Sequence, residues 1–166
     1  MRRTIVILSA VICPLLSSFA AAGMTVKYTA ITTINGQTID EKTLKNAPVI
    51  LSVMAEWCPS CRAEAYELQK AYEKYKDTGV LFIALFIKSS DNGIMKFAER
   101  NGVTFPVGQD IGIARQLGVW SVPVTFLVSK NGKIREQYFG LINEDAIRRG
   151  IEKIVSGEND GGDHKH

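Results

Sequence analysis

The sequence predicts an α/β protein with a mixed central sheet and helices on both faces of that sheet. Two apolar runs, residues 49–54 and 80–87, lack polar alternation, which is typical of strands buried on both sides. A helical pattern at residues 59–76 separates these runs, so we expect the two strands to be parallel. A third apolar run, residues 124–129, is followed by a tight turn and residues 133–139, which predicts an antiparallel pair.

Shorter elements complete the predicted pattern. Asn35-Gly36 is a strong hairpin signal between a β-rich stretch at residues 24–33 and a short return at residues 37–39, so an N-terminal β-hairpin is expected. The other expected elements are helices at residues 40–46, 91–100, 111–117 and 143–155, the last with Asn143 as its N-cap, and a short extended segment at residues 105–107.

The two ends of the chain differ in composition from the rest. Residues 1–22 have a positive start, an apolar run and an Ala-x-Ala pattern, which predicts a signal peptide; an uncleaved anchor is the alternative. The apolar run holds about 16 residues, fewer than the ~20 that span a bilayer. We expect residues 23–155 to form one domain in the periplasm or otherwise outside the cytoplasm, secreted or anchored to the inner membrane. Residues 156–166 are expected to be a disordered tail.

The charge balance gives no sign of a basic surface for nucleic acid. The chain has 20 Lys and Arg residues against 17 Asp and Glu residues, a net charge of +3. Two of the basic residues, Arg2 and Arg3, lie in the predicted signal peptide. Binding to nucleic acid is therefore not expected.

Two cysteines remain once the signal peptide and its Cys13 are removed. Cys58 and Cys61 lie where the first buried strand ends and the long helix begins, in a compartment that permits disulfides. Their sulfurs can close a small ring, and the free N–H groups of a helix start stabilise a thiolate on the first cysteine. A bridge between residues three apart restrains little of the unfolded chain, so the pair is predicted to be reactive rather than structural.

Other uses of a Cys-x-x-Cys pair fit this sequence poorly. A closed zinc site needs four ligands, and the mature chain adds only His164 and His166 in its tail. Copper delivery needs a wider cysteine spacing, and a peroxidase of the peroxiredoxin kind needs a lone cysteine after a Pro/Thr pattern. We expect no metal site and no cofactor other than a redox-active disulfide between Cys58 and Cys61.

Two motifs together resemble the thioredoxin superfamily. Trp57-Cys58-Pro59-Ser60-Cys61 follows an apolar strand, and Val122-Pro123 precedes another strand about 60 residues further on. The stretch from Gly118 to Val128 is similar to the TlpA/ResA-like thiol–disulfide oxidoreductases, and Cys-Arg-Ala-Glu at residues 61–64 is similar to the thioredoxins of cytochrome c maturation. The resemblance covers residues 28–155 and implies a thioredoxin-like fold.

The resemblance also implies a role for each matching residue. Cys58 would be the exposed nucleophile, and Cys61 the buried thiol that resolves the mixed disulfide. Pro123 would follow a cis peptide bond beside the sulfurs, where Val122 can pair with a substrate strand. Ser60 would hydrogen-bond to the Cys58 sulfur. The implied substrate groove consists of Trp57, Pro59, Ser60, Val122 and Pro123.

The sequence departs from the family where a proton acceptor for the buried thiol is usual. The central strand has no acid at residues 51–54, Pro59 stands between the cysteines, and Val124 follows the expected cis-proline. Glu56 is expected to point to the rim. We therefore expect the usual acceptors to be missing and the resolving step to be slow or water-mediated. Trp120 and Phe105 are each expected to pack in the core rather than line the groove.

The resulting functional prediction is an extracytoplasmic reductase of protein disulfides, as in cytochrome c maturation. Its expected partners are the thiols and disulfides of client proteins and a membrane electron donor, with a possible membrane tether through residues 4–20. One alternative is a periplasmic disulfide oxidase or isomerase. The other is a non-catalytic binding module with a thioredoxin fold.

Overall fold

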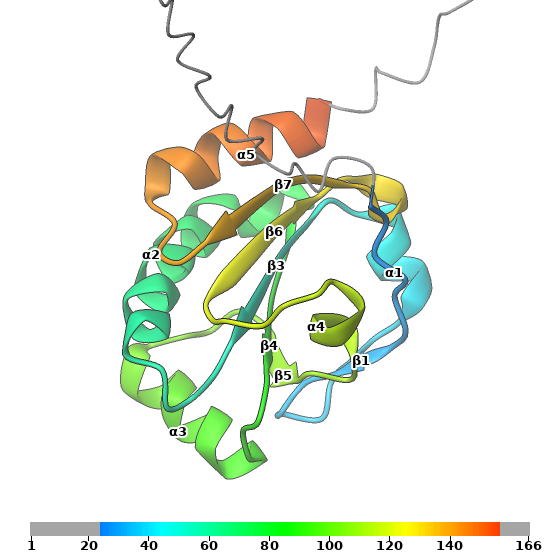
Figure 1. Ribbon diagram of the computed structural model, residues 1–166. Helices are drawn as coiled ribbons and strands as arrows, with labels where there is room; N and C mark the ends of the chain where they lie inside the picture. Colours follow the sequence, from blue (N-terminus) through cyan, green and yellow to red (C-terminus); the bar gives the residue numbers. More distant parts are fainter. Residues whose placement is uncertain (1–23, 157–166) are drawn as a thin grey trace, which may run out of the picture.

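The computed structural model describes residues 24–156 (Figure 1). The predicted signal peptide or anchor therefore lies outside the described residues, as does the predicted tail apart from Ser156. Ser156 ends the last helix instead of starting the tail. Within residues 24–156, no helix is both long enough and apolar enough to cross a membrane.

The central sheet has five strands in the order β5-β4-β3-β6-β7. The middle strand β3 runs parallel to β4 and antiparallel to β6, β5 is parallel to β4, and β7 is antiparallel to β6. The predicted mixed sheet with an antiparallel pair at one side is therefore confirmed. The strands are β3 (Val49–Met54), β4 (Leu81–Phe86), β5 (Val107–Gln109), β6 (Val124–Val128) and β7 (Ile134–Phe139).

Five α-helices surround the sheet, each within about two residues of its predicted bounds. They are α1 (Glu41–Asn46), α2 (Pro59–Tyr75), α3 (Asp91–Asn101), α4 (Ile113–Gln116) and α5 (Glu144–Ser156), with short 3₁₀ turns η1 (Lys76–Thr78) and η2 (Lys130–Gly132). The predicted cap of α5 is confirmed, because the Asn143 side-chain oxygen accepts a hydrogen bond of 2.9 Å from Ala146 N.

The middle strand β3 explains why the sheet needs helices on both faces. All six of its residues are buried, and successive side chains point to opposite faces of the sheet. Ile50 and Met54 join a core cluster with residues of α2, α3 and α5, whereas Leu51 and Val53 join a second cluster with residues of α1 and α4. The α/β architecture predicted from the apolar runs is therefore confirmed (Figure 1).

The N-terminal hairpin is present, but its strands are shorter than predicted. β1 (Ile31–Thr32) and β2 (Thr38–Ile39) have two residues each, and the prediction of one strand over residues 24–33 is wrong. The start of that stretch pairs with another part of the chain, since Thr25 bridges to Lys133 and Val26 N donates to Gly132 O. Gly132 is required there, because a Cβ at this position would lie 2.8 Å from Val26 O.

Helix α5 packs closely on the sheet through a glycine. A Cβ at Gly150 would lie 1.9 Å from Leu127 Cδ1 of β6, and both residues are buried. The absence of a side chain at Gly150 thus lets the middle of α5 lie close to β6.

We predict that Gly150→Ala lowers the free energy of unfolding by about 1–2 kcal/mol, because the methyl group forces Leu127 out of its packed position. Replacing glycine by alanine also raises helix propensity, which by itself would stabilise the protein by about 1 kcal/mol. The predicted net loss therefore requires that Leu127 cannot move aside at low cost. Denaturant titration measures the difference. Glu152→Ala on the exposed side of the same helix is the control, with an expected change within about 0.5 kcal/mol. Equal stability of Gly150→Ala and the parent would contradict the tight packing.

Candidate active site

The two cysteines lie at the start of α2, where β3 passes through a short turn into the helix. Cys58 is the N-cap residue, and its Sγ accepts a hydrogen bond of 3.3 Å from the backbone N of Cys61. The Ser60 Oγ lies 3.3 Å from the same sulfur, so the predicted contact between Ser60 and Cys58 is confirmed. The sulfur thus takes the place that a side-chain oxygen holds in most N-caps.

The predicted partner segment faces the sulfurs from the start of β6. Val122–Pro123 is a cis peptide bond, as expected, and the Cys58 thiol donates to Val122 O over 3.7 Å. Gly140 N, just after β7, donates to Pro123 O over 2.9 Å and fixes this turn to the neighbouring strand. Two segments far apart in the sequence therefore meet at Cys58.

Cys58 is less exposed than expected. Only 4% of the residue is exposed, so the prediction of an exposed nucleophile is wrong for this free-thiol form. Burial alone would raise the pKa of the Cys58 thiol, but hydrogen bonds from Cys61 and Ser60 to the sulfur outweigh burial and hold that pKa below its ordinary value. Cys58 is consequently the thiol that ionises first.

Cys61 is the more deeply buried member of the pair, and its predicted burial is confirmed. It has no exposed surface and lies one turn inside α2. Burial raises the pKa of the Cys61 thiol well above its ordinary value, and its contact with Cys58 and the charge of Glu64 raise it further. Relative to a free cysteine, the pKa of the Cys58 thiol is therefore lowered and that of the Cys61 thiol is raised.

Glu64 is a buried acid that the sequence interpretation missed. Its side chain has no exposed surface, and one carboxylate oxygen accepts hydrogen bonds from the hydroxyls of Ser52, at 3.2 Å, and Thr125. The other oxygen accepts from Ile142 N at 3.1 Å. The positions where the family usually carries an acid hold none, as the sequence shows, but α2 supplies a buried acid from a different position.

A signal for Glu64 was present in the helix periodicity. Glu64 follows Cys61 by three positions and precedes Leu68 by four, which places it in the buried stripe of α2. Ser52 and Thr125 are opposite each other in the register of β3 and β6, so both hydroxyls face this stripe from adjacent strands. Glu64 in the buried stripe of α2 thus meets one hydroxyl from each of two otherwise apolar strands.

The ionisation of Glu64 is also perturbed. Burial raises the pKa of its carboxyl above the ordinary value, although the hydrogen bonds from Thr125, Ile142 and Ser52 act in the opposite direction. A proton leaving Cys61 therefore has a carboxylate with a raised pKa one helical turn away.

An apolar rim lies beside the sulfurs. Trp57 is 57% exposed, Pro59 and Ser60 are exposed, and Val122 is half-buried, whereas Pro123 is buried beneath them. Trp120 is 85% exposed, so the prediction that it packs in the core is wrong, while Phe105 is buried as expected. Trp57 lies in the turn directly before Cys58, and Trp120 lies in the loop that leads to the Val122–Pro123 bond. Among residues 24–156, no group of three or more His, Cys, Asp or Glu side chains is arranged to hold a metal ion.

The sequence is similar to proteins with this chemistry. Residues 20–137 match the AhpC/TSA family. The chain is 34% identical over 127 residues to the thiol-disulfide oxidoreductase ResA of Bacillus thuringiensis, covering 75% of this chain and 73% of that protein. It is 27% identical over 139 residues to the ResA of Halalkalibacterium halodurans, covering 82% and 79% of the two chains.

Solved structures show the same fold. A putative thiol:disulfide interchange protein DsbE from Chlorobium tepidum superposes with a TM-score of 0.70 at 25% identity, over 81% of this chain and 97% of that one. StoA from Bacillus subtilis superposes with a TM-score of 0.65 at 22% identity, over 74% and 94% of the two chains. The chain therefore belongs to the AhpC/TSA family and, within it, to the thioredoxin-fold thiol–disulfide oxidoreductases of the ResA type.

Proposed function

We propose that this protein is an extracytoplasmic reductase of protein disulfides, with Cys58 as its nucleophile and Cys61 as its resolving thiol. The observation that carries the proposal is the placement of the two thiols: Cys58 caps α2 and accepts the N–H of Cys61, whereas Cys61 has no exposed surface one turn inside the helix. The pKa of the first thiol is lowered there and that of the second is raised. A thiolate forms first on Cys58, and the thiolate is the species that attacks a disulfide.

The first step joins the protein to its client. The Cys58 thiolate attacks one sulfur of the client disulfide, a bond forms between the two sulfurs, and the client's own disulfide bond breaks. The second client sulfur leaves as a thiolate and takes a proton from solvent. Trp57 and the Val122–Pro123 turn line the face on which the client chain would lie, and the exposed indole offers it an apolar contact.

The second step releases the client. Cys61 gives up its proton, and its thiolate attacks the Cys58 sulfur, which closes the Cys58–Cys61 disulfide and frees the second client thiol. Two electrons have then passed from the protein to the client. Glu64 is the proposed proton acceptor, because its buried carboxylate has a raised pKa and lies one turn along α2 from Cys61.

The proposal also specifies the direction of electron flow and the location of the protein. Both rest on the resemblance to the ResA-like reductases and on the predicted signal in residues 1–22. The proposed clients are proteins of cytochrome c maturation, and a membrane dithiol protein would return the electrons. A disulfide oxidase or isomerase would use the same two sulfurs in the reverse direction, so the reduction potential decides between them.

Ser60→Ala is predicted to raise the pKa of the Cys58 thiol by about half a unit to one unit, because the substitution removes one hydrogen bond worth about 1 kcal/mol from the thiolate. The pH midpoint of iodoacetamide labelling of Cys58 should move upward by that amount. Ser156→Ala at the far end of α5 is the control and should leave the midpoint unchanged. An unchanged midpoint in Ser60→Ala would show that Ser60 does not stabilise the thiolate.

Glu64→Gln is predicted to slow the resolving step about 100-fold at neutral pH, since the amide cannot accept the Cys61 proton. Single-turnover decay of a Cys58 mixed disulfide measures this step across pH, and the lost rate should return as pH rises and Cys61 ionises unaided. Alkylation of Cys58 should stay near the parent rate, which separates proton transfer from a general structural defect. Glu73→Gln, exposed on the same helix, is the matched control. A parent-like pH profile in Glu64→Gln would remove Glu64 from the mechanism.

Cys61→Ser is predicted to accumulate mixed disulfides with client proteins through Cys58, because the resolving thiol is gone. Non-reducing gels followed by peptide mass mapping detect the trapped bond. Cys58→Ser should trap nothing, and a non-catalytic binding module would trap nothing in either variant.

For the Cys58–Cys61 couple we expect a reduction potential at or below about −270 mV, the value of thioredoxin; a value near −120 mV would establish a disulfide oxidase instead.

A further inference from the structure

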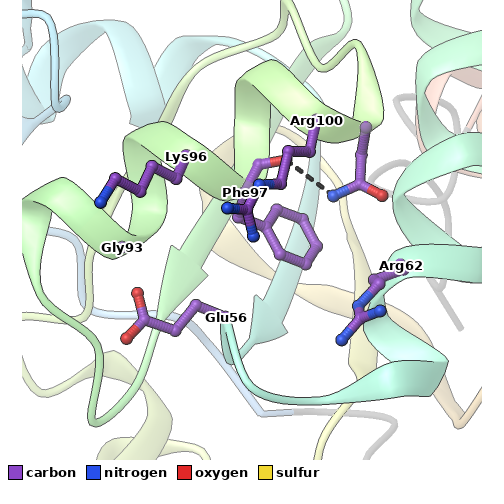
Figure 2. A pocket seen from close by; sticks show the side chains of 7 residues that line it. Glu56, Arg62, Gly93, Lys96, Phe97 and Arg100 are labelled. Carbon is purple, nitrogen blue, oxygen red and sulfur yellow. Dashed lines mark hydrogen bonds between the residues drawn. The ribbon is translucent and has the colours of Figure 1, made fainter.

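A cavity of about 410 Å³ opens beside the active site, between the start of α2 and one side of α3 (Figure 2). It is distinct from the cysteine site but adjoins it, because Glu56 lines the cavity and stands two residues before Cys58. Phe97 gives the cavity an apolar side, and its ring is held in edge-to-face contact with Phe86 at 5.1 Å. The volume falls in the range of roughly 300–1,000 Å³ that is usual for ligand sites.

Three cationic side chains line this cavity: Arg62 from α2, and Lys96 and Arg100 from α3. None of the three makes a side-chain hydrogen bond or ion pair with another residue in the part of the chain that the structure describes. Most other cations on these and neighbouring helices are paired with carboxylates. The paired side chains include Lys45, Lys70, Lys74, Lys76, Arg148 and Lys153. The cavity thus gathers positive charge that the protein itself does not neutralise.

The one carboxylate on the cavity wall offsets one of these three charges, so three cations and one carboxylate leave the lining with a formal charge of +2. Glu56 lies against the first turn of α3, where a Cβ at Gly93 would lie 1.3 Å from Glu56 Oε2. Its backbone N donates to Ser89 Oγ at 3.3 Å, which holds the turn before Cys58 against the start of α3. Figure 2 shows Glu56 beside Gly93 and Arg62 at the opposite side of the cavity. The prediction that Glu56 points to the solvent rim is therefore wrong, because the residue is half-buried in this wall.

We propose that this cavity binds an acidic segment of the polypeptide that reacts at Cys58, with Arg62 and Arg100 as the residues that receive its carboxylates. The inference rests on the proposed function, which makes a protein chain the partner of Cys58. Guanidinium groups bind carboxylates with two parallel hydrogen bonds, and neither group has a competing partner within residues 24–156. The acidic segment occupies the cavity while the neighbouring part of the same chain places its disulfide over Cys58. The cavity in this way selects and orients partners by charge.

The test uses two peptides that differ only in charge and that carry serine in place of cysteine, so that no exchange occurs. One has an Asp-Glu pair, and the other has Asn-Gln at the same positions. Amide chemical shifts of α2 and α3 report binding to the full chain. The acidic peptide should bind about fivefold more tightly, as expected for two exposed ion pairs, and the difference should disappear at about 0.5 M salt.

A pair of matched variants locates the effect. Arg62→Gln/Arg100→Gln should bind both peptides equally, whereas Lys42→Gln/Lys133→Gln, with the same change in net charge far from the cavity, should keep the preference. Equal binding of the two peptides by the parent protein would overturn the inference, and so would a preference that survives in Arg62→Gln/Arg100→Gln.

This result is independent of the redox proposal. Exchange with disulfide-bonded, cysteine-containing forms of the two peptides tests the redox function, because a dithiol reductase reduces a peptide disulfide whatever the charge of the neighbouring residues. Loss of all exchange with an intact charge preference would refute the redox proposal alone. Normal exchange without a charge preference would refute the acidic-segment site alone.

Discussion

One buried carboxylate joins the elements that form the active site. Glu64 of α2 accepts hydrogen bonds from β3 through Ser52, from β6 through Thr125, and from the chain entering α5 through Ile142 N. A carboxyl group without surface exposure is costly unless its oxygens are paired, and here both oxygens are. The position of α2 on the sheet, and with it that of the cysteines, depends on this interaction.

The chemistry of the two cysteines follows from where α2 begins. Cys58 caps the helix, so the N–H of Cys61 and the hydroxyl of Ser60 stabilise its thiolate. Cys61 lies one turn deeper, in the apolar layer between helix and sheet, where its thiolate is disfavoured and the charge of Glu64 disfavours it further. A single helical turn thus separates a thiol whose pKa is lowered from a thiol whose pKa is raised. In the proposed mechanism, Glu64 accepts the proton of the second thiol.

The surroundings of the cysteines differ on their two sides. Trp57 and the Val122–Pro123 turn lie next to Cys58 on one side, and Arg62, Lys96 and Arg100 line a cationic cavity on the other. Apolar contact is nearly indifferent to partner identity, whereas unpaired charge discriminates strongly and acts at longer range. The exchange reaction between sulfurs is the same for every disulfide, so selection among partners has to come from surfaces beside the cysteines, such as the cationic cavity.

The sequence by itself determined the sheet, the order of its helices and the reactive pair. Buried strands, helix caps and a Cys-x-x-Cys at a helix start are local patterns, so residues 49–54, Asn143 and Cys58 could be assigned without a structure. Tertiary structure alone decided the surroundings of those residues. Periodicity places Glu64 on the buried face of α2, but only the register of β3 and β6 sets the hydroxyls of Ser52 and Thr125 opposite it. The exposure of Trp120 was likewise decided by the tertiary structure. Such environments depend on contacts between distant segments, which composition and periodicity do not encode.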